Sequence, residues 1–283
     1  MAPAQLNLGV LYENGEGVAR SDAEAARWYA LAAEQGDLFA TLSLAFMYRE
    51  GRGLPRDDTR AAALFQKIAT QDYAIGAVNL AILYRDGDGV PQDYGKAIAL
   101  FEQAAKGGHP VAQNNLGLML EQGLGAPRNI ARAFEWYRKA AKQGLANAEY
   151  QLGRLYERGE GVSPSEREAA AWYRKAAEQG ETPAQLRLGL LYRDGRGVGR
   201  DPTRAVLWLR RAARQGDAEA QLRLGELYAA DAQDMTDPLE AYRWATLAER
   251  LTRDDGVRQE AEALRQDLMP RLSAEQVAHI DQS

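Results

Sequence analysis

The chain of 283 residues contains few side chains that could perform chemistry. It has no cysteine, which excludes a disulfide framework and a thiolate metal site. Its two histidines, His109 in a Gly-Gly-His-Pro turn and His279 near the C-terminus, have no identifiable metal-binding partners. The motifs H-E-x-x-H, G-x-S-x-G and G-K-[ST] do not occur. Because no nucleophile can be paired with a base, we expect no enzymatic activity, no metal and no cofactor, and a hydrolase is the least favoured interpretation.

Gly-x-Gly loops recur along the chain and superficially resemble phosphate-binding loops. They follow predicted helices rather than strands and recur in most copies of a repeat, so we interpret them as helix stops. The loop Asp86-Gly87-Asp88-Gly89 has a faint resemblance to a calcium loop. It lacks the alternating oxygen ligands and the distal glutamate of such loops, and a solvated loop is expected.

The elements that carry these residues repeat every 36 residues. A Leu-Gly or Leu-Ala pair marks each of seven copies without an insertion, and a fixed period of this length indicates a repeat architecture. The pairs are Leu8-Gly9, Leu44-Ala45, Leu80-Ala81, Leu116-Gly117, Leu152-Gly153, Leu188-Gly189 and Leu224-Gly225.

One clear copy is the segment 148–180, which predicts two amphipathic helices. Apolar residues recur at offsets of four, seven and eight in the first half and of three, four, seven and eight in the second, as one face of a helix requires. Gly159 is expected to end the first helix in a left-handed conformation, and Ser165 lies in the segment expected to cap the second. Gly153 and Ala169 are small residues where the helices should cross. Stacked copies would bury both apolar faces in an α-solenoid.

The pattern A-x-x-x-L-G-x-x-Y-x-x-G-x-G-V, followed by A-x-x-W-Y-x-x-A-A-x-x-G, resembles the Sel-one-like repeat (SLR) family over residues 2 to 250. This family is related to the tetratricopeptide repeats. The resemblance implies an all-α fold, a right-handed α/α superhelical solenoid, that serves as a non-enzymatic platform for protein partners. The Ala- and Arg-rich composition favours a bacterial origin. Some bacterial members carry several disulfides, and this chain departs from them.

We divide the chain into seven repeats in one solenoid, residues 1–253, and C-terminal capping helices, residues 254–283. The repeat period stops after Arg250, and Gly256 to Leu268 has the pattern of an amphipathic helix. Ser273 begins a capping box, Ser-Ala-Glu-Gln, that predicts a last helix through about Ile280. Terminal units of solenoids are atypical because they must cover the last apolar face.

Composition restricts the class of partner. The formal net charge is −5 with acidic and basic residues interspersed, which disfavours general nucleic-acid binding. No apolar run approaches the roughly 18 residues that a membrane span needs. The N-terminal MAPAQLNLG has no features of a signal peptide and leads directly into the first repeat. If an export signal was removed before it, a periplasmic or secreted location is expected, and otherwise a cytoplasmic one.

By the resemblance to tetratricopeptide stacks, the first helix of each copy lines the concave face. Two positions seven residues apart should then point inward, and in copies two to four they are apolar and would form a hydrophobic trough. These candidates for partner binding are Phe39 and Phe46, Ile75 and Ile82, and Val111 and Leu118. The later pairs, Asn147 and Arg154, Pro183 and Leu190, and Glu219 and Glu226, are mostly polar. The alternative is that the apolar pairs pack as ordinary core.

A second, polar column lies beside the first. It comprises Asn7, Ser43, Asn79, Asn115, Gln151, Arg187 and Arg223. Amide side chains suit an extended peptide backbone, and arginines suit a carboxylate. Asn114 and Tyr150 interrupt an otherwise aliphatic column in the middle of the array. We expect partner contacts at Asn79, Asn115, Tyr150, Gln151, Arg187 and Arg223, with a solvated face as the alternative.

The leading hypothesis is a non-enzymatic bacterial adaptor that binds a protein or peptide in its concave groove. The alternative is a specific inhibitor or immunity protein that covers a secreted toxic enzyme such as a phospholipase effector. The chain itself is expected to be a monomer or to self-associate weakly, since the open ends of a solenoid expose apolar faces.

Overall fold

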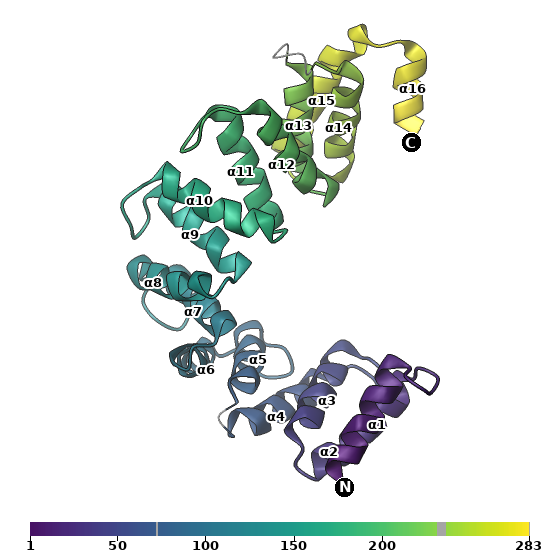
Figure 1. Cartoon of the computed structure of the whole chain (residues 1–283), viewed down its shortest axis with the longest axis vertical. Helices are drawn as coiled ribbons and strands as arrows, with labels where there is room; N and C mark the ends of the chain where they lie inside the picture. Colours follow the sequence, from purple (N-terminus) through teal and green to yellow (C-terminus); the bar gives the residue numbers. More distant parts are fainter. Residues whose placement is uncertain (72, 231–235, 283) are drawn as a thin grey trace. The chain divides into compact units, whose positions relative to one another are not determined.

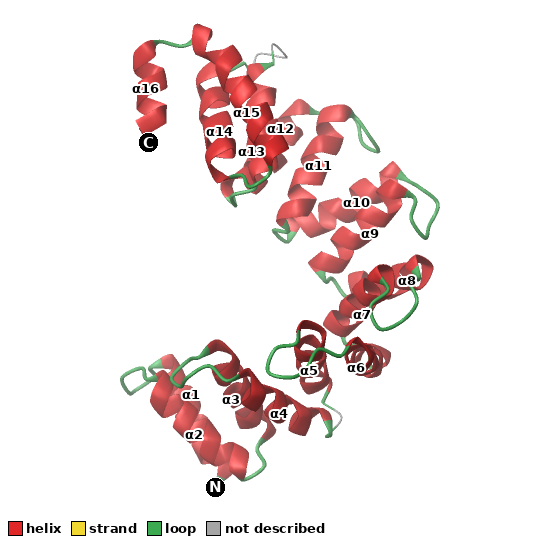
Figure 2. Ribbon diagram, turned by 180° about the vertical axis from the view of Figure 1, so that it is seen from behind, coloured by secondary structure: helices red, strands yellow, loops and turns green. Residues whose placement is uncertain are grey.

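The computed structural model of the chain describes residues 1–71, 73–230 and 236–282. These residues form helices joined by short loops, and no strand occurs among them (Figures 1 and 2). The chain forms two compact units, Met1–Gln143 and Gly144–Ser283. The predicted all-α solenoid of seven helix pairs is confirmed. None of the described helices is both long enough and apolar enough to cross a membrane.

The first unit contains four helix pairs, and each second helix packs against the first helix of the next pair in this unit. The helices are α1 (Ala2–Asn14), α2 (Asp22–Glu34), α3 (Leu38–Glu50), α4 (Asp58–Ala69), α5 (Ala74–Asp86), α6 (Tyr94–Lys106), α7 (Pro110–Gln122) and α8 (Ile130–Lys142).

The second unit contains three helix pairs and a C-terminal extension. Its elements are α9 (Ala146–Arg158), α10 (Glu166–Glu178), α11 (Thr182–Asp194), α12 (Pro202–Arg214), α13 (Ala218–Ala229), α14 (Pro238–Leu251), α15 (Asp255–Leu268), the 3-10 helix η1 (Met269–Arg271) and α16 (Ala274–Gln282). Most of the loop from Ala230 to Thr236, like Asp72 in the first unit, lies outside the described residues.

The helix pair α9–α10 ends its first helix and caps its second where the sequence predicts. The first helix of the pair α9–α10 ends at Arg158, and Gly159 follows it with φ of 68°. The side chain of Ser165 accepts a hydrogen bond from the backbone N–H of Glu168 at 3.2 Å and so caps α10. A left-handed glycine satisfies the last carbonyls of one helix, and the serine satisfies a free N–H of the next.

The second glycine of the Gly-x-Gly loop has a different role, which is contact with the preceding repeat. Gly53 has φ of 70°, and a Cβ atom there would lie 2.2 Å from the backbone carbonyl of Asp22 at the start of α2. Gly89 meets Asp58 at the start of α4 in the same way, at 2.2 Å. Gly17, in the first repeat, has the same conformation with no atom within 4 Å. The second glycine therefore lets a loop touch the backbone of the previous second helix.

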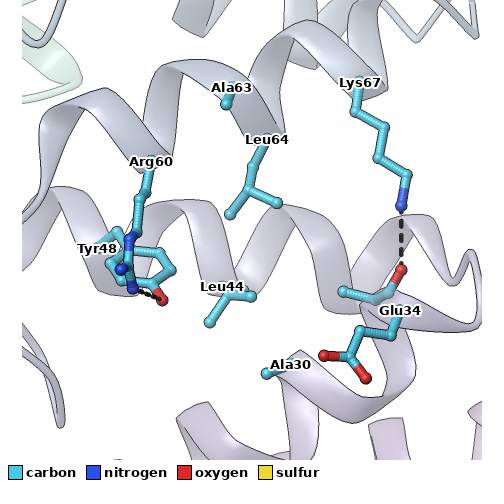
Figure 3. A pocket seen from close by; sticks show the side chains of 9 residues that line it. Ala30, Glu34, Leu44, Tyr48, Arg60, Ala63, Leu64 and Lys67 are labelled. Carbon is cyan, nitrogen blue, oxygen red and sulfur yellow. Dashed lines mark hydrogen bonds between the residues drawn. The ribbon is translucent and has the colours of Figure 1, made fainter.

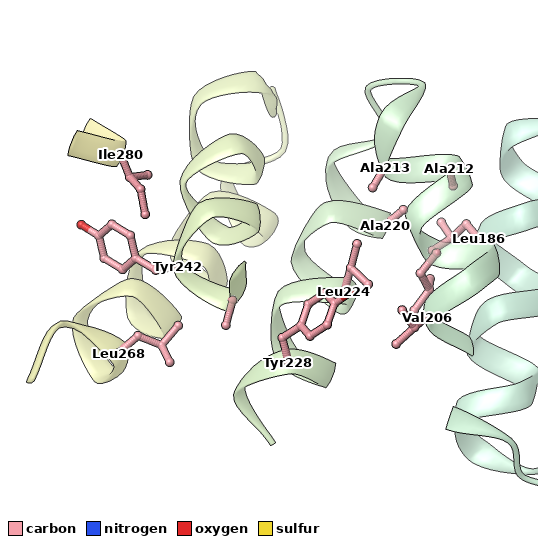
Figure 4. Close-up of a cluster of buried hydrophobic side chains, with 12 residues drawn as sticks. Leu186, Val206, Ala212, Ala213, Ala220, Leu224, Tyr228, Tyr242, Leu268 and Ile280 are labelled. Atoms are coloured by element: carbon pink, nitrogen blue, oxygen red, sulfur yellow. The ribbon is translucent and has the colours of Figure 1, made fainter. Parts of the chain in front are cut away.

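The C-terminal extension matches its prediction. The expected helix from Gly256 is α15, which packs on α13 and α14. At the start of α16, Ser273 N–H donates to Gln276 Oε1 at 2.9 Å, and Gln276 N–H donates to Ser273 Oγ at 3.2 Å, which is the predicted capping box. Ile280 of α16 is buried in one apolar cluster with Tyr242 and Leu268 (Figure 4). The division of the chain at residue 254 stays a prediction.

Gly53→Ala and Gly17→Ala separate the two costs of losing a loop glycine. Gly17→Ala should lower the free energy of unfolding by about 1 kcal/mol, because only the left-handed conformation is penalised. Gly53→Ala adds the clash with Asp22 and should cost about 2–4 kcal/mol. Urea unfolding followed by circular dichroism measures both, and equal losses would show that the contact between loop and helix contributes nothing.

Candidate functional site

Three repeats join their two helices through a glycine, a tyrosine and a glutamate. The glycine leaves room for the tyrosine ring: a Cβ at Gly9 would lie 2.4 Å from Tyr29, and one at Gly153 would lie 2.5 Å from Tyr173. The hydroxyl groups then donate to carboxylates on the first helix. These bonds are Tyr29 to Glu13 at 2.6 Å, Tyr137 to Glu121 at 2.8 Å and Tyr173 to Glu157 at 2.7 Å.

Copies two and three replace this set with alanine, phenylalanine and arginine. In copy three these residues are Ala81, Phe101 and Arg85. A phenyl ring has no hydroxyl to donate, and the arginine at the glutamate position instead reaches the next first helix. Arg85 Nη1 donates to Asn115 Oδ1 at 2.8 Å, and Arg49 of copy two lies 3.5 Å from Asn79 Oδ1.

The asparagines of the predicted polar column are therefore engaged within the chain. Asn79 is buried, and its amide nitrogen donates to the carbonyl of Ile75 at 2.9 Å. Asn115 donates to the carbonyl of Val111 at 2.8 Å. Each amide thus donates within its own helix and accepts from an arginine of the preceding repeat, which reduces what it can offer to a peptide.

The predicted site residues of the second unit are also engaged by the chain. Arg187 Nη2 lies 3.3 Å from Glu157, and Gln151 accepts a hydrogen bond from Arg154 at 3.0 Å. Arg223 Nη1 pairs with Glu226 at 2.7 Å and with a second carboxylate on α15 at 2.8 Å. The Tyr150 ring is half-buried, with its centroid 5.7 Å from that of Tyr173. The carboxylates that satisfy these arginines come from the protein itself.

The apolar pairs divide between solvent and core. Phe39 is 67% exposed and Ile75 is 37% exposed, both in the first turn of their helices. Phe46 is half-buried, and its ring meets the edge of Phe65 at a centroid distance of 5.4 Å. Val111, Ile82 and Leu118 are partly buried. Phe39 and Ile75 therefore face solvent, whereas Phe46, on a C-terminal turn, packs against the core, so neither alternative describes all of these side chains.

The sequence-based set omitted Val10, which the 36-residue period places at the Phe46 position of α1. Val10 is 38% exposed. We call the set of these side chains on α1, α3, α5 and α7 the apolar column. It comprises Val10, Phe39, Phe46, Ile75, Ile82, Val111 and Leu118, all in the first unit.

Neither histidine contributes to a candidate metal site. His109 precedes α7 and is half-buried, and desolvation lowers the pKa of its imidazole. Its Nδ1 is buried without a hydrogen-bond partner among the described residues. His279 is exposed on α16. In the part of the chain that the structure describes, no three His, Asp or Glu side chains form a group that could hold a metal ion.

Comparison with known proteins places the repeats in one family. The Sel1 repeat model matches residues 2–37, 39–73, 74–109, 110–145, 146–181, 182–217 and 218–251. A Sel1 repeat protein from Oxalobacter formigenes is 34% identical, over 93% of this chain and 76% of its own, with a TM-score of 0.77. A protective antigen of uropathogenic Escherichia coli with an SLR fold is 33% identical, over 99% of this chain and 67% of its own, with a TM-score of 0.59. No curated protein matches the sequence.

Glu13→Gln tests the contact between tyrosine, glutamate and the next repeat. Desolvation acts to raise the pKa of Glu13, but hydrogen bonds from Tyr29 and from Arg52 (2.8 Å) outweigh it and lower the pKa below the ordinary 4.5. A lowered folded-state pKa stabilises the fold above about pH 4.5, and this stability is lost as the pH falls through the folded pKa. Glu13→Gln should cost about 1 kcal/mol at pH 7 and progressively less below pH 4.5.

The free energy of unfolding in urea at pH 7 and at pH 3 gives this comparison. Glu50→Gln is the matched control, because Glu50 is an exposed partner of the same Arg52. A cost of Glu13→Gln that is the same at both pH values would contradict the assignment.

Proposed function

We propose that this chain, which belongs to the Sel1 repeat family, binds a protein partner through the apolar column of its first unit. Sel1-repeat proteins are generally non-catalytic scaffolds for protein interactions. Beyond this general role of the family, we propose that the chain acts as an adaptor and that the apolar column is its binding surface. By the resemblance to tetratricopeptide stacks, the apolar column lies on the face of the first helices that would bind a peptide.

The observation that carries the proposal is the exposure of Phe39 on the apolar column. A phenylalanine at 67% exposure forfeits most of the roughly 1.5–3 kcal/mol that full burial of such a side chain provides. Ile75 on the next first helix and Val10 on the previous one extend the apolar surface. Exposed apolar surface that continues over several elements marks an interaction site.

The second unit supports the proposal by contrast. On α9 and α13 the equivalent positions carry Asn147, Arg154, Glu219 and Glu226, whereas α11 keeps Pro183 and Leu190. If apolar side chains at these positions were needed for stacking, α9 and α13 would carry them as well. Aromatic side chains are also over-represented among residues that dominate binding energy at interfaces, which makes Phe39 the expected anchor.

The inhibitor of a single enzyme remains the alternative, and it would use the same surface. An adaptor should bind several partners or peptides weakly. An inhibitor should bind one enzyme tightly, at a ratio of one to one, and abolish its turnover. An immunity protein from Pseudomonas aeruginosa with a TM-score of 0.47 and 21% identity carries no argument for either.

Phe39→Glu and Ile75→Glu test the proposal. Neither side chain is buried, so each variant should keep its helicity and melt within about 2 °C of the wild type. Each should lose the same partner from a bacterial lysate, and the purified partner should bind at least about tenfold more weakly, because a carboxylate would be desolvated at the interface. Isothermal titration with the purified partner measures this loss.

Leu207→Glu is the matched control, because Leu207 is an exposed leucine, at 48%, on a second helix of the other unit. It should retain the partner. Phe46→Glu is unsuitable as a probe, because its contact with Phe65 makes loss of stability the expected result. Retention of the partner by both folded variants, Phe39→Glu and Ile75→Glu, would reject the apolar column as the binding surface.

A further inference from the structure

A groove of about 410 Å³ lies between α2, α3 and α4 of the first unit (Figure 3). Ala30, Leu44 and Leu64 contribute its apolar lining, and Glu34 and Tyr48 contribute polar atoms. We call it the α2–α4 groove. It involves the second helices of two repeats, whereas the apolar column lies on first helices, so the inference below does not rest on the proposed function.

The second unit contains the equivalent groove, 144 residues further along the sequence, between α10, α11 and α12. There the chain supplies an arginine that the first unit lacks. Arg174 Nη2 donates to the Tyr192 hydroxyl at 2.9 Å. Arg204 Nη1 donates to the same hydroxyl at 3.2 Å, and its guanidinium carbon lies 5.5 Å from the centre of the tyrosine ring.

The α2–α4 groove contains one of these two arginine–tyrosine contacts. Arg60 Nη1 donates to the Tyr48 hydroxyl at 3.0 Å, and its guanidinium carbon lies 5.4 Å from the ring centre. The residue at the Arg174 position is Ala30, so the second guanidinium is missing. Between α12 and α13 of the second unit, Arg210 again donates to a tyrosine hydroxyl, that of Tyr228.

We propose that the α2–α4 groove binds an arginine side chain of a partner protein. Its guanidinium would donate to Tyr48, as Arg174 does to Tyr192. Its aliphatic stem would cover Ala30 and Leu64. Leu64 stands at the position of the larger Trp208 in the second unit. The carboxylate of Glu34 lines the groove and forms no ion pair among the described residues, so it supplies the complementary charge.

Two cations of the chain, Arg60 and Lys67, also line the groove, and both are bonded within the chain. Arg60 corresponds to Arg204, which shares one hydroxyl with Arg174 in the second unit. Lys67 donates to the carbonyl of Ala33 at 3.1 Å. A planar guanidinium is preferred over an ammonium, because its several donors are held in a fixed fork on a long apolar stem.

The test is a titration of the full chain with N-acetyl-L-arginine amide, followed by NMR of the leucine methyl groups. We expect saturable shifts at Leu44 and Leu64. The citrulline analogue, which keeps the shape but not the charge, should bind about tenfold more weakly. Tyr48→Phe, which removes the acceptor and keeps the ring, should weaken binding of the arginine amide by about tenfold.

Ala30→Arg is the decisive variant, because it supplies in the chain the side chain that the partner would provide. It should abolish the shifts, whereas Ala131→Arg, which adds the same charge at an exposed position of α8, should not. Conversely, the groove of the second unit has a volume of about 350 Å³ with Arg174 in place, and Arg174→Ala should free its Tyr192 hydroxyl and raise the stoichiometry from about one to about two ligands per chain. Equal binding of the arginine and citrulline amides, or undiminished binding by folded Ala30→Arg, would overturn the proposal.

Discussion

Every helix pair depends on how closely its two helices can cross, and this distance is set by the residue that follows the leucine of the repeat. Where the second helix brings a tyrosine to the crossing, as at Tyr29 and Tyr173, only glycine fits, because a methyl group would lie within 2.5 Å of the ring. Protein interiors are close-packed, so such a clash cannot be absorbed without moving one helix. The distance between the two helices then determines which polar groups of the first helix the tyrosine hydroxyl can reach.

The tyrosine hydroxyl links the crossing within one repeat to the next repeat through hydrogen bonds. Tyr29 donates to Glu13, and Glu13 also pairs with Arg52 of the following repeat at 2.8 Å. Phenylalanine cannot do this, and copies two and three carry arginine where the glutamate would be, with asparagine as the acceptor. One set therefore occurs in copies one, four and five, and the other in copies two and three. Exchanging a single member would leave a carboxylate without its tyrosine donor or place an arginine against a hydroxyl, so these positions are coupled in energy.

The fold could be predicted from the sequence because each of its determinants is local. The helix stop at Gly159, the cap at Ser165 and the capping box at Ser273 depend on residues within a few positions. The candidate site could be predicted only in part, because burial depends on the neighbouring repeat. Periodicity placed Phe39 and Phe46 on one face but not their different exposure, which arises from Phe65 on the adjacent helix. It also could not show that Asn79 is buried and bonded to Arg49.

A repeat protein supplies comparisons within itself that a globular domain does not. A position that is apolar and exposed in one unit and charged in the other, as Phe39 and Glu219 are, is free of the demands of stacking, so its chemistry is available for binding. The same reasoning applies to Ala30 and Arg174, where one copy contains a side chain that another copy lacks. The groove that contains Arg174 shows that a guanidinium can reach the tyrosine hydroxyl there, and the α2–α4 groove retains the equivalent hydroxyl of Tyr48 and the carboxylate of Glu34. Variation between copies thus distinguishes residues that build the solenoid from residues that a partner can use.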